Sequence, residues 1–451
     1  GSGGTLRVLA GGTLDVTGDF GILYNQGGAV ARLVVVAGGT LRRITSTNPV
    51  QFTMAADDSG TVNVQTGTLD LSGGGSSSGL LSVSIGATLE FGGGTHTLLA
   101  GSSVTGAGSV QITAGTLNAA GGWSITGTTL LSGGAANFNG TSMATGGLIV
   151  SGGTLGGVSP GLLTVSGPMT WSGGNLTGGG GATRVLSGGT LAVSGSSTGR
   201  QINNYALELA GTGTWNTTIA NMNSGSGGTL RVLAGGLLDV TGDFGISYNQ
   251  GGAASLVDNQ GTFNRITSAG VVDFSLPFNN SGTVNVTTGT LELSNGGSQN
   301  GAIAVTGGAV LSYVAGTFNL QNGQNATGAG VVQLNGATLS GLAVGDTARF
   351  TNLVLNTGAL NPAAGGTVRV AGLLDWAGTA SLGGGGATLV ALGGTLTLTG
   401  TVTRQLNNHT LENGGTATWA STFTLNSGSG AVIRNRAGGT FTMSGNGSYL
   451  Y

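Results

Sequence analysis

The sequence contains no cysteine, no lysine and only five prolines among its 451 residues. The missing cysteine excludes a disulfide framework and thiolate metal sites. The scarce proline, together with glycine that has no strict period of three, excludes collagen. Charged residues number 13 arginines and 15 acids, too few for a solvated disordered chain with so many aliphatic side chains. The net charge of −2 gives no electrostatic reason to expect nucleic acid or an anionic membrane as a partner.

Glycine supplies 96 of the residues, and short Thr-Leu-x-Val segments recur between glycine-rich turns. Two apolar side chains alternate with two polar ones in each segment, which is the period of a strand with one buried face. No apolar period of 3.6 residues persists for two helical turns, and no apolar run reaches the roughly 18 residues of a membrane-spanning helix. The apolar pairs expected to face inward are Leu6/Val8, Leu14/Val16, Val62/Val64 and Leu69/Leu71.

The chain repeats itself over long distances. Residues 1–29 match residues 225–253 at all positions but two, and a third copy begins at Gly428 and places Tyr451 on Tyr24. We therefore predict repeat units at 1–224, 225–427 and 428–451, joined as one continuous rod. One block carries most of the length difference, since it runs from Gln111 to Leu148 in the first unit but only from Gln333 to Leu353 in the second. A gain or loss of about 17 residues between aligned flanks indicates a modular element near that size.

Strands of three to five residues between tight turns predict an all-β parallel β-solenoid, in which each strand pairs with its equivalents in the turns above and below. Three strands per turn give roughly 20 turns of about 20–24 residues, and a rod on the order of 100 Å long at about 4.8 Å per turn.

The GGTLxV segments, SGTVNVQTGTLDLSGGG at 59–75 and the stretch at 152–195 resemble the repeat regions of giant bacterial surface proteins. These include filamentous-haemagglutinin-type adhesins and autotransporter passenger domains, and the resemblance covers nearly the whole chain. It implies a right-handed β-helix and export to the cell surface or the extracellular space. It leaves the ligand open, because such rods serve as spacers, adhesins, matrix fibres and enzyme scaffolds.

Asp15 and Asp19 lie four residues apart across a glycine turn and recur as Asp239 and Asp243. They could form paired carboxylates or a calcium site. We favour an outward strand residue and a turn residue, because the third copy has uncharged residues at both places. Asp57 and Asp58 lie in AADDSG, which by composition predicts a solvated turn.

His96 and His409 are not equivalent between the copies, and neither completes a Ser-His-Asp or metal-ligand spacing. The arginines are scattered, unlike the clustered charges of a polysaccharide lyase. We therefore predict no enzyme, and no catalytic, cofactor-binding or metal-binding residues.

Other polar and aromatic residues recur at matching places. Asn63 and Asn285 are expected in hydrogen-bonded asparagine ladders, as are Asn203/Asn204 and Asn407/Asn408. We expect two sets of aromatic residues to close the core, with sugar contact as the alternative. The sets are Trp171, Trp215, Trp376 and Trp419, and Tyr24, Tyr248 and Tyr451.

Together these features predict a structural, non-catalytic segment of a bacterial extracellular or cell-surface fibre. The alternatives are a carbohydrate-binding adhesin and a polysaccharide-active β-helix enzyme. The expected partners are copies of the chain, or further repeats of it, stacked end to end, with surface polysaccharide as a further candidate. No nucleic acid and no membrane-spanning segment are expected. Because both ends lack capping sequences, we expect these residues to be a window on a longer fibre.

Overall fold

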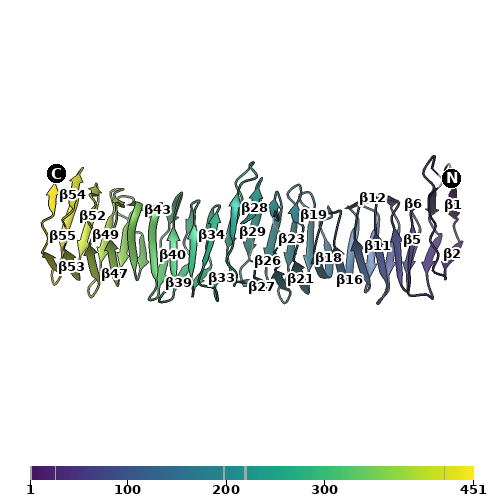
Figure 1. The fold of residues 1–451 in the computed structure, drawn as a ribbon, viewed down its shortest axis with the longest axis horizontal. Coiled ribbons are helices and arrows are strands. Elements are labelled where there is room, and N and C mark those ends of the chain that lie inside the picture. Colours follow the sequence, from purple (N-terminus) through teal and green to yellow (C-terminus); the bar gives the residue numbers. More distant parts are fainter. Residues whose placement is uncertain (1–2, 26, 197–198, 218–220, 421) are drawn as a thin grey trace. The chain divides into compact units, whose positions relative to one another are not determined.

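The computed structural model describes residues 3–25, 27–196, 199–217, 221–420 and 422–451. It is an all-β parallel β-solenoid of about 20 turns, as predicted, and the described residues include 57 strands and no helix. Figure 1 draws these short strands as arrows coloured along the sequence. Gly1, Ser2 and Gln26, which belong to the first repeat match, lie outside the described residues.

The chain divides into two compact units. The first comprises Gly1–Asn216, Met222–Arg231 and Asn249–Ala253, and the second comprises Thr217–Asn221, Val232–Tyr248 and Ala254–Tyr451. Within each unit, every third strand pairs in parallel with its equivalent one turn later, which produces three stacks that we call A, B and C. Strands β28 (Asn221–Gly225) and β29 (Thr229–Val232) contain residues of both units.

In the first unit, stack A contains β1 (Thr5–Val8), β3 (Arg32–Val35), β6 (Ala55–Asp58), β9 (Gly75–Ser77), β12 (Thr95–Leu98), β15 (Thr116–Ala119), β17 (Ala135–Phe138), β19 (Thr154–Gly156), β22 (Asn175–Thr177), β25 (Gln201–Asn203) and β28. Stack B contains β2 (Thr13–Val16), β4 (Thr40–Arg43), β7 (Thr61–Val64), β10 (Leu80–Val83), β13 (Ser103–Gly106), the first parts of β16 (Gly122–Leu131) and β18 (Met143–Val150), β20 (Leu162–Val165), β23 (Ala182–Val185) and β26 (Ala206–Leu209). Stack C contains β5 (Pro49–Phe52), β8 (Thr68–Leu71), β11 (Thr88–Phe91), β14 (Ser109–Ile112), the second parts of β16 and β18, β21 (Pro168–Trp171), β24 (Thr190–Val193) and β27 (Thr212–Trp215).

In the second unit, each stack takes the letter of the first-unit stack whose strands have the same place in the sequence repeat. Stack A then contains β32 (Leu256–Asn259), β35 (Phe278–Asn280), β38 (Gly297–Gln299), β41 (Thr317–Leu320), the second parts of β43 (Val331–Gly341) and β45 (Leu353–Pro362), β48 (Ser381–Leu382), β51 (Arg404–Asn407), β54 (Thr424–Gly428) and β57 (Ser448–Leu450). Stack B contains β30 (Leu237–Val240), β33 (Thr262–Arg265), β36 (Thr283–Val286), β39 (Ala302–Val305), β42 (Asn325–Thr327), β44 (Thr347–Phe350), β46 (Thr367–Val370), β49 (Ala387–Val390), β52 (Thr410–Asn413) and β55 (Val432–Asn435). Stack C contains β31 (Gly245–Tyr248), β34 (Val271–Ser275), β37 (Thr290–Leu293), β40 (Val310–Tyr313), the first parts of β43 and β45, β47 (Leu373–Trp376), β50 (Thr395–Leu398), β53 (Thr416–Trp419) and β56 (Thr440–Met443).

The length of a turn varies with its loops. A short turn places Leu80 in register with Thr61, whereas a much longer one places Asp273 in register with Gly245. The turn length predicted from the sequence falls between these two. Long turns occur in both repeats next to the Val-Thr-Gly-Asp-Phe motif.

The predicted inward pairs are mostly buried. The second apolar residue of every test pair is buried, and so are Val62 and Leu69. Leu6 is 36% exposed and Leu14 is half-buried. Both belong to the first described turn, where β1 and β2 each pair on one side only. The register of the segments is therefore the predicted one, and burial is completed where turns lie on both sides.

The modular length difference is one complete turn. In-register partners run Val110, Thr129, Leu148, Met169 in the first unit and Val332, Leu353, Leu374 in the second. Between Val110 and Leu148 the first unit therefore makes two turns, whereas between the aligned Val332 and Leu353 the second unit makes one. That single turn of the second unit is slightly longer than either of its counterparts, which explains why the net difference is smaller than a whole turn.

The tryptophans predicted for the core are there, since none of the four is more than 3% exposed. The same prediction for the three tyrosines is wrong. Tyr24 and Tyr248 are half-buried and Tyr451 is 97% exposed. Tyr24 lies in a loop rather than on a strand, and its hydroxyl donates to the carbonyl of Gly28. For Tyr24, apolar alternation before the residue does not place it in the core because the strand has ended, whereas Tyr248 is the last residue of β31 and is still only half-buried.

Candidate functional site

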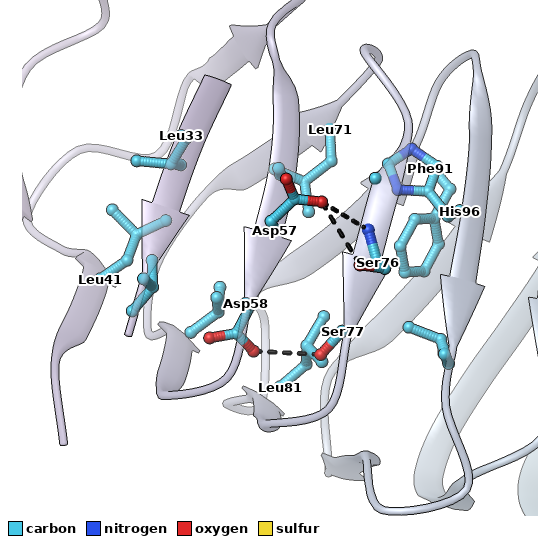
Figure 2. Close-up of a pocket in the computed structure, with 15 residues that line it drawn as sticks. Leu33, Leu41, Asp57, Asp58, Leu71, Ser76, Ser77, Leu81, Phe91 and His96 are labelled. Atoms are coloured by element: carbon cyan, nitrogen blue, oxygen red, sulfur yellow. Dashed lines mark hydrogen bonds between the residues drawn. The ribbon is translucent and has the colours of Figure 1, made fainter. Parts of the chain in front are cut away.

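A buried polar cluster in the first unit lies where β6, β9 and β12 follow one another in stack A (Figure 2). Asp58 occupies the last, inward position of β6. Its Oδ2 accepts a hydrogen bond of 3.1 Å from Ser77 Oγ, and its Oδ1 accepts one of 2.9 Å from the Gly60 backbone N–H. Burial raises the pKa of Asp58, and these two donors partly oppose the increase.

The prediction that Asp57 and Asp58 form a solvated turn is wrong. Both belong to β6, whose alternation directs Asp57 outward and Asp58 inward. Asp57 forms an ion pair with Arg32, and it accepts hydrogen bonds from the backbone and side chain of Ser76. Asp58 has its own donors inside the solenoid, so a carboxylate can occupy an inward place.

The cavity beside this cluster has a volume of about 20 Å³ and is lined mainly by aliphatic side chains such as Leu33, Leu41 and Leu81. Such a volume accommodates about one water molecule, whereas ligand pockets measure roughly 300–1,000 Å³. The cavity is therefore a packing feature of the interior, with room for solvent and none for a sugar.

His96 also lines this cavity, and burial lowers its pKa. Its ring lies 4.8 Å from that of Phe91, and Figure 2 places it beside Phe91, away from the Asp58–Ser77 hydrogen bond. Ser77 donates directly to Asp58. This order differs from the one that activates a serine, in which serine donates to histidine and histidine to the carboxylate.

Asp15 and Asp19 are bound by two different arginines. Arg42 donates from Nε and Nη2 to the two oxygens of Asp15, both at 2.7 Å, and these bonds lower the pKa of Asp15. Asp19 lies outside this pair and accepts hydrogen bonds from another set of residues. Among the described residues, no group of three or more His, Asp or Glu side chains is arranged to hold a metal ion.

Arg43, next to Arg42 in sequence, points into the protein and is fully buried. It donates to the backbone oxygens of Gly18 at 2.9 Å and Asn48 at 2.7 Å, and to Asp19 Oδ1 at 2.9 Å. Hydrogen bonds from Ser46, Asn48 and Arg43 lower the pKa of Asp19. Arg43 thus ties the long loop of one turn to the next turn.

The second unit repeats this arrangement. Arg265 is fully buried and donates to the carbonyls of Gly242 and Gly270, both at 3.1 Å, and to Asp243. Sequence reasoning missed both buried arginines, although a signal existed. In TLRR and TFNR, arginine stands at the fourth position, where the repeating segment has an inward Val.

Two further buried arginines hold another pair of loops. Arg200 donates to the carbonyls of Trp171 and Gly195, and its guanidinium lies 5.4 Å from the Trp171 ring. The guanidinium of the equivalent Arg404 lies 3.8 Å from the ring of Phe423. Burial lowers the pKa of Arg404 to about 10, so this side chain keeps its charge at neutral pH.

His409 is buried and fully hydrogen-bonded. Its Nδ1 lies 2.8 Å from the carbonyl oxygen of Gly383, and its Nε2 lies 2.9 Å from Thr388 Oγ1. The carbonyl requires a donor, so Nδ1 carries the proton and Nε2 accepts from Thr388. Burial lowers the pKa of His409, which favours this neutral form.

Of the two asparagines in TVNV segments that were predicted to form ladders, Asn285 forms one and Asn63 does not. Asn285 donates to Asn264 Oδ1 at 2.8 Å, and Asn264 donates to Asp239 Oδ1 at 2.7 Å. Asn63 instead lies in register with Arg42, whose guanidinium is bound to Asp15. Asn204 and Asn408 have positive φ values of 48° and 47°, which places them in turns that asparagine tolerates well.

Surface charges form local groups. Glu208 is nearly buried between Arg184 and Arg231, and the equivalent Glu412 pairs with Arg434 and Arg436. The arginines of these surface groups are thus paired with carboxylates of the same chain, whereas the buried Arg200 and Arg404 are held by backbone carbonyls and aromatic rings.

No protein-family model matches this chain, and no curated protein is similar to it in sequence. A search of the described residues for an apolar helix of membrane-spanning length found none.

Proposed function

We propose that the chain is a structural, non-catalytic segment of a bacterial extracellular or cell-surface fibre, acting as a rigid spacer, matrix or adhesive rod. The observation that supports this proposal is the continuity of the three stacks of parallel strands within each unit. Backbone hydrogen bonds tie every turn to its neighbours, so resistance to unfolding extends along the solenoid. The resemblance to surface-protein repeats supports an exported location.

The use of the ionisable groups also favours a structural role over a polysaccharide-active enzyme. Asp58 accepts hydrogen bonds within the interior, and Arg43 and Arg265 anchor long loops. An active site needs groups poised towards a substrate in a concave pocket. The cluster in Figure 2 instead surrounds a space of about 20 Å³ inside the solenoid.

We further propose that the partner is the same fold, as another copy or as further repeats stacked end to end. Two nearly identical loops support this idea. Phe20 is 57% exposed, whereas its equivalent Phe244 is 4% exposed. In the second loop Gly242 lies so close to Thr217 of the preceding turn that an added Cβ would come within 2.3 Å of its carbonyl oxygen. The loop sequence is therefore suited to being covered by a turn.

Electron microscopy of the native material, combined with mass measurement in solution, tests both proposals. We expect elongated particles and concentration-dependent association that Phe20→Asp weakens. Ile85→Asp is the matched control, because Ile85 is 82% exposed but lies away from this loop. Compact particles, association unaffected by Phe20→Asp, or release of sugar products from a polysaccharide panel would contradict the proposal.

A further inference from the structure

Two arginines lie side by side on the outer face of stack B in the second unit. Arg349 of β44 is in register with Arg369 of β46, and the residues flanking each of them on its strand are buried. Arg349 is exposed and Arg369 is half-buried. Neighbouring strands are about 4.8 Å apart, so two positive side chains leave the sheet one strand spacing from each other.

This pair is not neutralised as the ion-paired surface arginines Arg42 and Arg184 are. Among the described residues, no carboxylate lies within the 4.0 Å ion-pair distance of either guanidinium. Asn325 precedes Arg349 in the register and Leu389 follows Arg369. Like charges directly opposite each other destabilise a sheet. A repulsive pair without a counter-charge is therefore a place where a bound anion would add stability.

Two threonines complete the site. Thr347 and Thr367 are also in register, each two residues before an arginine on the same strand. Positions two residues apart on a strand face the same side and lie roughly 7 Å apart. The surface thus presents two hydroxyls at one end and two guanidiniums at the other, over a distance comparable to the width of one sugar ring.

We propose that Thr347, Arg349, Thr367 and Arg369 form a binding site for a uronate unit of an acidic polysaccharide. The planar guanidinium fork suits a carboxylate, to which it can donate two parallel hydrogen bonds. The threonine hydroxyls can donate to and accept from the sugar hydroxyls. A nucleic acid is a poorer fit, because its affinity comes from many phosphate contacts and this chain has a net charge of −2. The site is additional to the scaffold role proposed above.

The first unit supplies the residues for a clean test. Ala144 and Thr164 stand in register at the equivalent places of β18 and β20. The double variant Arg349→Ala/Arg369→Thr therefore installs a pair that the same fold already carries. The matched control is Arg42→Asn/Arg184→Leu, which takes its residues from the equivalent positions of the second unit and removes the same charge from ion-paired arginines.

Binding of polygalacturonate oligosaccharides to the full chain would be measured by calorimetry, with neutral dextran and dextran sulfate as comparison ligands. We expect the wild type and the control to bind the polyuronate equally and the site variant to bind it roughly tenfold or more weakly. Arg349→Lys/Arg369→Lys keeps the charge without the planar guanidinium fork, so its affinity for polyuronate should lie between those of the wild type and the site variant. Dextran should bind none of the proteins.

Equal binding by the wild type and the site variant would overturn the proposal, and so would a wild type that does not bind polyuronate. Tighter binding of dextran sulfate than of polyuronate, lost in the same variant, would overturn the assignment to carboxylate. The melting temperature of the site variant should equal or exceed that of the wild type, because a like-charge pair has been removed. The variant should also keep the particles seen by microscopy, so this proposal and the scaffold proposal fail separately.

Discussion

The two repeats place different polar groups at one inward position. In the first repeat it is Asp58, which accepts from Ser77 and from a backbone amide. In the second it is Asn280, whose Oδ1 accepts from Asn259 at 2.8 Å. Both side chains are buried, and both strands occupy the same place in stack A. The interior therefore does not require a particular charge at this place, and each of the two side chains finds hydrogen-bond partners there.

A second inward position shows the same freedom with different groups. Tyr205 OH lies 2.8 Å from Thr183 Oγ1 in the first repeat, and His409 Nε2 lies 2.9 Å from Thr388 Oγ1 in the second. The threonine partner is retained while the ring facing it changes. The fold therefore retains the hydrogen-bonding threonine in both repeats, and it tolerates a change of the side chain that faces this threonine.

The largest effect is expected from removing a buried arginine. Arg265→Ala removes a donor from the carbonyl of Gly242, and one of the donors to the carbonyl of Gly270 and to the carboxylate of Asp243. We expect a loss of roughly 3 kcal/mol in the stability of this region. Hydrogen exchange of residues 241–255 and urea unfolding would measure it. Arg42→Asn is the control, because the exposed Arg42–Asp15 pair should contribute less than about 1 kcal/mol. Equal losses would show that burial of the arginine is unimportant.

A pH-dependent effect is expected at His409. Its pKa is lowered in the folded state, so the unfolded chain takes up a proton first as the pH falls below the usual value of 6.5. The stability contribution is therefore lost on acidification through that window. His409→Tyr, which installs the residue found at Tyr205, should reduce this loss. Urea midpoints on both sides of the window test it, and an unchanged acid dependence would contradict the role of His409.

The opposite sign is expected at Asp58. Burial raises its pKa in the folded state, so the folded chain keeps the proton more readily than the unfolded one. Stability should fall as the pH rises above the ordinary value of 3.8, because the folded state must then hold a buried carboxylate. Asp58→Asn should therefore gain stability relative to the wild type across that rise. A difference independent of pH would show that Asp58 titrates normally.

The smallest effect concerns the asparagine ladder. Asn285→Ala removes the donor to Asn264 and should cost about 1 kcal/mol. Asn63→Ala, at the same place in the first repeat, should cost less, because Asn63 has Arg42 rather than an asparagine as its register neighbour. Thermal unfolding of the two single variants makes the comparison, and equal costs would mean that the ladder adds nothing.

Much of the fold could be predicted because local alternation decides which residues face inward. The pairs Val62/Val64 and Leu69/Leu71 follow from TVNV and TLDL alone, and the tryptophans follow from the same pattern. The prediction failed for Asp58, because its charge favoured a solvated turn although its position in the alternation of β6 faces inward. It failed for Tyr24, because the strand had already ended.

The arginine pair could not have been found in this way. Arg349 and Arg369 belong to successive turns, and their adjacency depends on the lengths of the loops between them. Turn length varies widely along the chain, so spacing in the sequence does not fix which residues meet across turns. Binding surfaces on a solenoid arise from this register between turns, whereas the core arises from the pattern within each strand.

The additional turn in the first repeat has a consequence for how such molecules change over generations. Thr129 and Leu148 occupy the same place on successive turns, so an in-frame copy or deletion of the codons between them leaves both flanking turns able to meet. Each such event changes the length by one increment of about 4.8 Å. The length of the solenoid is therefore set by the number of turns that the coding sequence contains. Selection can adjust this length one turn at a time, while the kinds of contact between turns stay the same.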